Sequence, residues 1–251
     1  MNDVKLIWSF VHSLNLYDDK SYILDMYKAS MKLAKKLGYE INFYGDTRSI
    51  TYLSEYLDNY VEVKASDFIL IDDLKIYIHR HEGLNACTID GDILLHKRLN
   101  FKDPDMTDMY FEASENTKQV FNKYVPLLKI FSEYQIQNII PEWNRLSKNS
   151  VNSGIVKFNN EKSKKIILDR YKSLRDYYLS EIEPVHRLLN SLMLPGIITG
   201  QFMYSNIAQF YNYKISYMND NTYVHYAGNM TQKLKAKDVV YKILLTPPTL
   251  I

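Results

Sequence analysis

The residues best suited to chemistry are two aspartates, Asp90 and Asp92, separated only by Gly91. They lie within ACTIDGDILLHKRL, residues 86–99, between two apolar runs. Two carboxylates held this close repel each other, and removing them from water costs free energy. In an extended segment residues i and i+2 point to the same side, so both carboxylates can face one point. A divalent cation would turn this repulsive pair into a site, and Mg²⁺ and Mn²⁺ prefer oxygen ligands.

The same D-x-D pattern occurs a second time, at Asp103 and Asp105 around Pro104. That copy lies in a polar stretch, which is typical of a turn. The first copy instead follows an apolar strand, at the position where open α/β sheets bind ligands. We therefore interpret residues 90–92 as a metal site and residues 103–105 as a surface turn. For either copy taken alone, the competing interpretation is a solvated turn.

A histidine near the end of the sequence could complete such a site. His225 lies in YVHYAGNMTQK and is followed by Gly228 and Lys233. A neutral imidazole, a close backbone approach and a lysine cation would together suit a metal-bound diphosphate. The alternative is that His225 is a packed core residue among aromatic neighbours.

Two further polar segments contain candidate site residues. VNSGIV, residues 151–156, contains Asn152 and Gly154 at the start of a predicted strand. The amide could point at a polyol hydroxyl, or the segment could be a simple turn. Gln201 opens an apparent helix in TGQFMYSN and is either a site residue or a solvated residue of the first turn.

Two charged residues could contact a nucleotide or phosphate. Asp46, at the end of the second predicted strand, is either a helix N-cap or a nucleotide contact. Lys75 is either a solvated helix lysine or a phosphate contact. Nucleophilic catalysis has weaker support, because Cys87 and the serines show no partner spacing. The two common glycine-rich phosphate loops do not occur in the sequence.

The elements that must position these side chains alternate between strand and helix in the first half. We predict strands at 4–11, 40–45, 60–64 and 86–90, and helices at 19–37, 47–57 and 72–82. This order favours a largely parallel sheet covered by helices. In the first helix the apolar face is formed by Ile23, Met26, Tyr27, Met31 and Ala34, and Gly38 is the expected C-cap.

The second half is less regular. We predict strands at 109–114 and 153–158, and two late strands in KISYM and TYVHYAG. Predicted helices cover 117–140, with an interruption near Pro126, and 160–180. Two more helical stretches in 184–213 are separated by LPGIITG. Repeats and linkers rich in proline, glycine or serine are missing from the sequence, so we predict one domain over residues 1–251.

Composition excludes several classes of protein. Of 251 residues 46% are hydrophobic and 24% charged, and the net charge is +2, which is ordinary for a globular protein and argues against a nucleic-acid partner. The single cysteine excludes an internal disulfide. The N-terminal apolar run is too short for a signal sequence, and no run approaches about 18 apolar residues. We therefore expect a cytoplasmic protein, which is compatible with peripheral contact at the inner face of a membrane.

The order of these segments carries a family resemblance. CTIDGDILLHKRL, then VNSGIVKF, TGQF and VHYAG with a following lysine, resembles the GT-A fold glycosyltransferases that use nucleotide sugars. The closest likeness is to retaining galactosyl- and glucosyltransferases and to bacterial relatives with an IDGD strand. It spans about residues 4–235, and its specificity comes from the order of short motifs.

The resemblance implies a GT-A, Rossmann-like fold with a mixed, mostly parallel sheet flanked by helices. It implies that Asp90, Asp92 and His225 bind Mn²⁺ or Mg²⁺, and that Gln201 and Asn152 act at the sugar. The implied donor-binding residues are Ser9, Asp46, Lys75, Gly91, Asn152, Gly154, Gly228 and Lys233. Two positions depart from the family pattern: Gly200 replaces an acidic residue, and Thr231 stands where the family has lysine, with Lys233 two residues later.

The implied reaction moves a hexose from a nucleotide sugar, with a UDP-sugar favoured, to a hydroxyl of a glycan or glycolipid in polysaccharide biosynthesis. The cation would neutralise charge on the leaving diphosphate, and the resemblance favours retention at the anomeric carbon. Two other functions remain open. One is a non-catalytic nucleotide- or saccharide-binding protein of the same fold, and the other is a metal-dependent nucleotidyltransferase.

Overall fold

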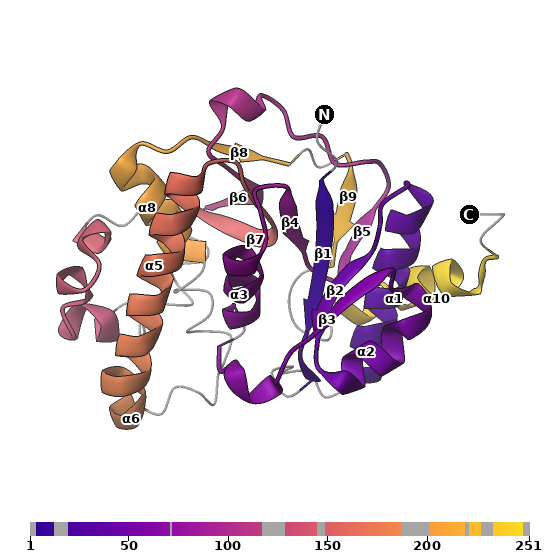
Figure 1. Ribbon diagram of the computed structural model, residues 1–251, viewed down its shortest axis with the longest axis horizontal. Helices are drawn as coiled ribbons and strands as arrows, with labels where there is room; N and C mark the ends of the chain where they lie inside the picture. Colours follow the sequence, from indigo (N-terminus) through magenta and orange to yellow (C-terminus); the bar gives the residue numbers. More distant parts are fainter. Residues whose placement is uncertain are drawn as a thin grey trace. The chain divides into compact units, whose positions relative to one another are not determined.

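The computed structural model describes residues 4–12, 20–70, 72–116, 129–144, 149–186, 201–218, 221–226 and 233–247 (Figure 1). The chain divides into two compact units, which are described separately. The first unit comprises Met1–Ile69, Asn85–Phe101 and Met218–Ile251, and the second comprises Leu70–Leu84 and Lys102–Tyr217.

The first unit is built on a parallel sheet with the strand order β3-β2-β1-β4. Its strands are β1 (Lys5–Phe10), β2 (Asn42–Gly45), β3 (Asn59–Glu62) and β4 (Ala86–Ile89). Two further strands, β5 (Ile93–Leu95) and β9 (Tyr223–His225), pair antiparallel. The helices are α1 (Lys20–Lys36), α2 (Thr47–Leu53) and α10 (Lys237–Leu245), and α10 packs on α1. Short 3₁₀ turns occupy Ser54–Tyr56 and Ala65–Asp67.

The amphipathic pattern of α1 explains how it covers the sheet. The predicted face residues Ile23, Met26, Met31 and Ala34 are all buried. Gly38 ends the helix with φ of +78°, a conformation that glycine adopts without strain. Both the helix and its C-cap therefore confirm the prediction from the sequence.

The second unit contains β6 (Met109–Asn116), β7 (Asn149–Phe158) and β8 (Ile215–Tyr217). Strand β6 pairs antiparallel with β7 and parallel with β8. The helices are α3 (Asp73–His81), α5 (Glu161–Tyr177), α6 (Glu183–His186) and α8 (Met203–Tyr211), and a π-helical turn over Tyr178–Ile182 follows α5. Short 3₁₀ turns lie at Pro104–Met106, Ile136–Asn138 and Pro141–Asn144. The core combines aliphatic side chains with several large aromatic ones, including Phe111, Phe131, Phe158, Tyr171 and Tyr204.

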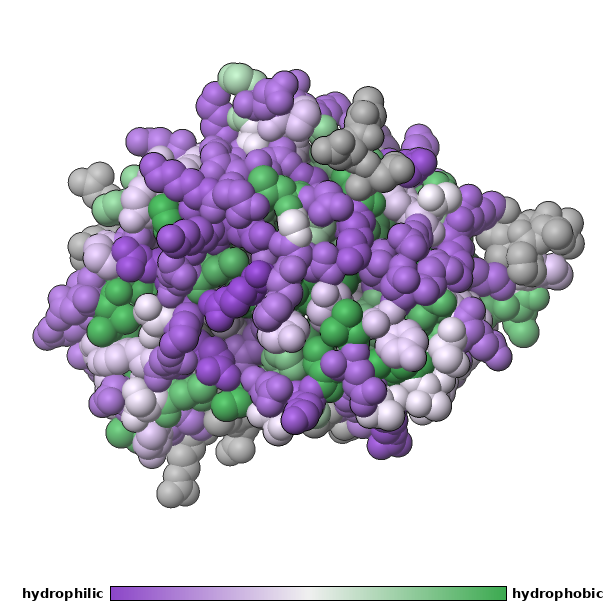
Figure 2. All heavy atoms as spheres, viewed as in Figure 1, coloured by the Kyte–Doolittle hydropathy of each residue, from purple (hydrophilic) through white to green (hydrophobic). Residues whose placement is uncertain are grey.

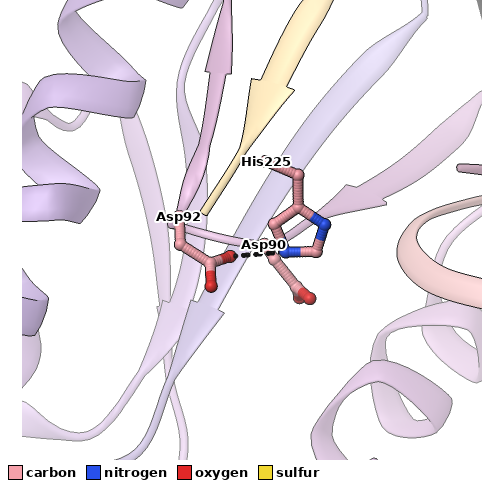
Figure 3. A group of neighbouring side chains, drawn as sticks. All are labelled: Asp90, Asp92 and His225. Carbon is pink, nitrogen blue, oxygen red and sulfur yellow. Dashed lines mark ion pairs between the residues drawn. The ribbon is translucent and has the colours of Figure 1, made fainter. Parts of the chain in front are cut away.

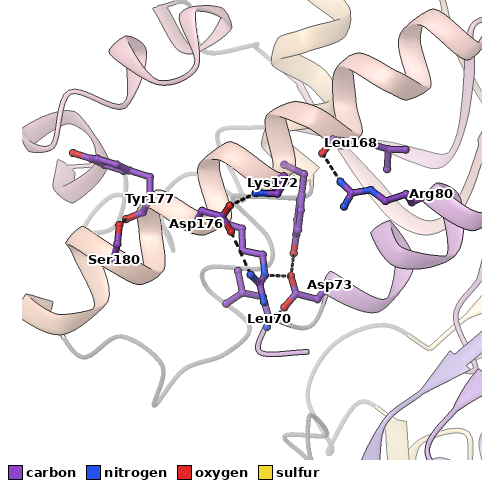
Figure 4. Close-up of polar contacts among 10 residues, drawn as sticks. Leu70, Asp73, Arg80, Leu168, Lys172, Asp176, Tyr177 and Ser180 are labelled. Carbon is purple, nitrogen blue, oxygen red and sulfur yellow. Dashed lines mark hydrogen bonds and ion pairs between the residues drawn. The ribbon is translucent and has the colours of Figure 1, made fainter. Parts of the chain in front are cut away.

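A buried carboxylate ties α3 to α5 in this unit (Figure 4). Asp73 accepts hydrogen bonds from the Arg175 Nε at 2.6 Å, the Tyr171 hydroxyl at 2.9 Å and the Leu70 backbone N–H at 2.8 Å. Burial, together with the neighbouring carboxylates, raises the pKa of Tyr171 well above its usual value, so its hydroxyl remains a donor. The network satisfies the charge of Asp73 away from water.

Replacing Tyr171 with phenylalanine is expected to lower the free energy of unfolding by about 1 kcal/mol. The change removes one donor from Asp73 and keeps the ring and the Arg175 bond. Lys172→Ala is the matched control on the same helix, because the Lys172–Asp176 pair is exposed and should contribute less than about 0.5 kcal/mol. Urea unfolding of both variants measures the difference. Equal destabilisation by the two changes would contradict this account of the network.

The observed fold is α/β, with mostly parallel strands flanked by helices, as predicted from the sequence (Figure 1). Each predicted strand is present, with ends shifted by a few residues. One predicted helix is wrong in its described part: residues 129–133 are helical, but Gln135 adopts a left-handed conformation and a 3₁₀ turn follows. Residues 117–128 of that helix and the LPGIITG break lie outside the described residues. Helix α10 was not predicted.

Hydrophilic residues cover most of the face of the molecule shown in Figure 2, with smaller hydrophobic areas between them. Within the described ranges, no helix combines the length and the apolar character needed to cross a bilayer.

Candidate functional site

The first group of candidate residues forms where β4 ends. Strand β4 is buried and parallel to β1, so it delivers Asp90 to the carboxyl end of the sheet. The chain then turns through Gly91, and the Ile93 N–H closes the turn on the Asp90 carbonyl at 3.2 Å. The position matches the ligand-binding edge of open parallel sheets.

Pairing between β5 and β9 brings in the histidine. Ile93 lies opposite His225 in the register, and the Tyr226 N–H bonds to the Asp92 carbonyl at 3.0 Å. As a result, ligand atoms of Asp90, Asp92 and His225 all lie within 4.8 Å of one another (Figure 3). The structure therefore brings together, from distant parts of the sequence, three residues predicted as metal ligands.

Asp92 carries the strongest electrostatic interactions in this group. Its Oδ1 lies 3.2 Å from the His225 Nε2, and its Oδ2 bonds to the Lys233 ammonium. Burial alone would raise the pKa of Asp92, but the His225 hydrogen bond and the charges of His225 and Lys233 lower it overall. Asp92 is therefore ionised at neutral pH.

Lys233 is held in place by its backbone as well as its side chain. It is 4% exposed, and its carbonyl accepts a hydrogen bond from the Tyr22 hydroxyl of α1 at 2.9 Å. Its ammonium supplies positive charge beside the paired carboxylates. Part of the repulsion between Asp90 and Asp92 is thereby balanced by the chain itself.

The donor set fits a hard divalent cation. Two carboxylates and one imidazole are ligands that Mn²⁺ and Mg²⁺ accept. Ligand atoms of the three residues lie within 4.8 Å of one another, so small side-chain movements would let all three hold one ion. Because Lys233 shares Asp92, a cation would compete with its ammonium for that carboxylate.

Two other residues of the first unit that were predicted to bind the nucleotide-sugar donor, Asp46 and Ser9, make hydrogen bonds within the chain. Asp46 is the N-cap of α2, since its Oδ1 accepts a hydrogen bond from the Ser49 N–H at 2.9 Å. Its Oδ2 accepts a second bond, at 2.9 Å, from the His12 N–H beyond the end of β1. The Ser9 carbonyl accepts a hydrogen bond from the Tyr27 hydroxyl at 2.8 Å. Gly228 lies outside the described residues, as do Gly200 and Thr231.

The second unit holds its own small group of predicted residues. The Lys75 ammonium donates to the Ser153 carbonyl at 2.8 Å, and the Asn152 Oδ1 accepts from the Gly154 N–H at 3.1 Å. Helix α3 and strand β7 thus bring Lys75 to the segment 152–154. Gln201 is half-buried just before α8, and its carbonyl accepts a bond from Ser205.

The second D-x-D copy is a surface turn, as predicted. Asp103, Pro104 and Asp105 are all exposed. Asp103 adopts a left-handed conformation with φ of 50° and begins the 3₁₀ turn at Pro104–Met106.

Tyr27 is a residue whose position at the site was not predicted. The sequence indicated only a place on the apolar face of α1. In the structure its ring contacts Gly91 so closely that a Cβ at that position would overlap it. The ring also packs edge-on against Phe10, with centroids 5.2 Å apart. Together these contacts fix the turn between the two aspartates, and the sequence offers no signal for them besides the glycine itself.

Replacing Gly91 with alanine is expected to displace this turn. The added methyl must push away the Tyr27 ring, and overpacking of this kind costs about 1 kcal/mol or more. We expect Mn²⁺ affinity to fall at least about tenfold, because the two carboxylates lose their spacing. Calorimetric titration and thermal unfolding measure the two effects.

Gly38→Ala is the matched control for this change. Gly38 has positive φ, but a Cβ there would meet no atom within 4 Å among the described residues. The control therefore strains the backbone without touching the aspartates, and it should leave Mn²⁺ affinity unchanged. Unchanged affinity in both variants would contradict a role of the Gly91 turn in metal binding.

Comparisons with known proteins give a distant likeness in structure. No protein-family model matches the chain, and no curated protein matches it in sequence. The CTP:phosphocholine cytidylyltransferase of Streptococcus pneumoniae is similar over 95% of this chain and 99% of its own, with a TM-score of 0.47 and 12% identity. The PaToxG glycosyltransferase is similar over 86% of this chain and 89% of its own, with a TM-score of 0.38 and 11% identity. Both scores are below 0.5, so this likeness supports no statement about function.

Proposed function

We propose that this protein is a metal-dependent glycosyltransferase with a GT-A-like fold, which moves a sugar from a nucleotide-sugar donor to a hydroxyl acceptor. The observation that carries the proposal is the convergence of Asp90, Asp92 and His225 at the carboxyl end of a parallel strand. Two carboxylates and an imidazole suit the cation that such transfer uses, and their place in the sheet suits a nucleotide ligand.

The proposed roles follow from the contacts of each residue. Asp90, Asp92 and His225 hold Mn²⁺ or Mg²⁺, which would neutralise charge on the leaving diphosphate. Lys233, when released from Asp92, can pair with phosphate oxygens, and charge-assisted bonds of this type are strong. Tyr27 and Gly91 keep the carboxylates at a fixed spacing.

Finer features of the proposal rest on the sequence resemblance. They are a UDP-sugar donor, transfer of a hexose with retention, and a glycan or glycolipid acceptor. Asn152 and Gln201 are proposed to contact the sugar, and Lys75 and Gly154 the donor. In the second unit, the contact of Lys75 with the 152–154 segment is compatible with this set.

A second candidate function has one observation in its favour. The Lys233 ammonium already bonds to Asp92, so the carboxylate pair has a local counter-charge from the chain. A protein that binds a nucleotide or saccharide without transferring it would then need no metal ion to balance the two carboxylates.

One experiment separates these functions. The protein is incubated with Mn²⁺ and a panel of nucleotide sugars and nucleoside triphosphates, and release of nucleoside diphosphate or pyrophosphate is measured with and without chelator. Slow, metal-dependent release supports the transferase. Binding without turnover favours the second candidate, and pyrophosphate release from a nucleoside triphosphate would indicate nucleotidyl transfer instead.

His225→Ala is expected to lower metal-dependent donor affinity at least about tenfold, or about 1.4 kcal/mol. The imidazole lies within 4.8 Å of both carboxylates, so its loss removes one metal ligand. The backbone pairing of β9 with β5 does not depend on this side chain. Calorimetry with Mn²⁺ and with chelator measures the effect, and thermal unfolding is recorded on the same variant. A lower melting temperature with unchanged affinity of the folded protein would mean that His225 is a packing residue.

A further inference from the structure

Helix α10 presents an outer face whose composition is unusual for a solvated helix. Of its nine residues only Val240 is buried. Four apolar side chains of the segment 233–245 are substantially exposed: Leu245 at 83%, Val239 at 42%, Leu234 at 41% and Tyr241 at 38%. Single exposed apolar residues need no explanation, but a group of them on one short segment does.

Basic side chains border this apolar group. Lys235, Lys237 and Lys242 are exposed, and Asp238 is the acidic residue of the same segment. Positions 237, 241 and 245 follow one another at intervals of four, so they lie along one stripe of the helix. The Lys237 ammonium lies 5.9 Å from the centroid of the Tyr241 ring, which places a cation beside the stripe.

The helix is held in one orientation on the first unit. The Lys32 ammonium of α1 donates to the Leu244 carbonyl at 2.9 Å and the Thr246 carbonyl at 2.7 Å. The Tyr22 ring of α1 packs edge-on against Tyr241, with centroids 6.4 Å apart. These contacts fix the orientation of α10 on α1, and Tyr241 lies at the edge of the packed side with 38% of its surface still exposed.

We propose that the exposed side of α10 that carries Leu234, Tyr241 and Leu245, together with Lys235, Lys237 and Lys242, binds the surface of an anionic lipid membrane. Apolar side chains of this kind enter the boundary between headgroups and acyl chains, and a tyrosine suits that boundary because one end of it is polar. The lysines can extend toward lipid phosphates while their methylenes cover apolar surface.

The charge pattern selects an anionic membrane over other occupants. Three exposed lysines against one aspartate leave net positive charge on the face, and each lysine near an anionic bilayer is worth about fivefold in affinity. A self-association interface built on this face would instead bring like charges together. The inference goes beyond the proposed transfer reaction and does not depend on it.

Vesicle co-sedimentation of the full chain tests the proposal. Vesicles of phosphatidylcholine alone are compared with vesicles containing about 30% phosphatidylserine, at low and high salt. We expect binding to the anionic vesicles that weakens with salt. The double change Lys235→Glu with Lys242→Glu should reduce it at least about tenfold, and Leu245→Ser about fivefold or more.

Matched controls keep the test specific to α10. Phe210→Ser removes an apolar side chain that is 55% exposed on α8, and Lys165→Glu reverses an exposed charge on α5. Both should bind as the unchanged protein does. Absence of binding to anionic vesicles, or equal losses in the α10 variants and the controls, would overturn the proposal. So would a dimer, seen by sedimentation, that the α10 variants dissociate.

Discussion

Replacing Asp90 with asparagine is expected to lower Mn²⁺ affinity about 100-fold or more, and metal-dependent turnover with it. Changes in groups that merely support a metal ligand cost about 10–100-fold, so loss of a ligand charge should reach at least the upper end of that range. The side-chain volume is nearly unchanged, and α1 and β4 keep their packing. Calorimetric titration with Mn²⁺ and release of nucleoside diphosphate measure the two effects.

The double variant Asp103→Asn with Asp105→Asn is the control, because it removes both charges of the second D-x-D, which lies in an exposed turn. Its Mn²⁺ affinity should equal that of the unchanged protein. If Asp90→Asn binds Mn²⁺ equally well, the metal role of the pair is refuted. Loss of binding in the control alone would place the metal at the other D-x-D.

Asp92 is a less clean probe than Asp90 for a physical reason. Its carboxylate bonds to the buried Lys233 ammonium as well as to His225. Asp92→Asn would leave the Lys233 charge without its partner, and breaking buried pairs costs about 3–5 kcal/mol. A fall in metal affinity in that variant would therefore combine lost ligation with lost stability.

The sequence predicted the elements around the site well because they follow local rules. Alternating strands and amphipathic helices gave the parallel sheet, and apolar spacing gave the buried face of α1. The sequence correctly predicted that residues 103–105 form an exposed turn and that residues 90–92 follow a buried strand, because a proline marks the first and an apolar run precedes the second. These features depend on residues close together in the chain.

What the sequence could not provide depends on distant pairing. The contact of Tyr27 with Gly91 and the bond of Lys233 with Asp92 join segments that are far apart in sequence. The lysine was expected at a diphosphate, and nothing in the local pattern indicates its bond to Asp92. Helix α10 was not predicted, although Val240, Ile243 and Leu244 follow the spacing of one helical face.

A buried histidine outside the candidate site is expected to make the stability of the protein depend strongly on pH. His79 of α3 is 2% exposed, and its ring packs edge-on against Phe158 with centroids 4.9 Å apart. Burial, followed by the charges of Lys164 and Lys75, lowers the pKa of His79 to about 3. The folded protein therefore keeps this imidazole neutral over a range in which an unfolded chain protonates it.

The sign of the pH dependence follows directly. Below about pH 6.5 His79 binds a proton in the unfolded state but not in the folded state. The free energy of unfolding therefore falls as pH falls. Between about pH 8 and about pH 4.5 this one group should remove about 3 kcal/mol of stability. The contribution ends near pH 3, where folded His79 also becomes protonated.

His79→Phe should abolish that part of the pH dependence, because the replacement keeps an aromatic ring against Phe158 and cannot bind a proton. His81→Gln is the matched control, since His81 lies on the same helix at the exposed surface. Urea unfolding of both variants at the two pH values gives the differences in free energy, and carboxylates cancel because all the proteins share them. The His79 variant should lose about 3 kcal/mol less than the unchanged protein on acidification, while the control should follow the unchanged protein. An equal acid loss in all three proteins would show that the proton taken up on unfolding does not go to His79.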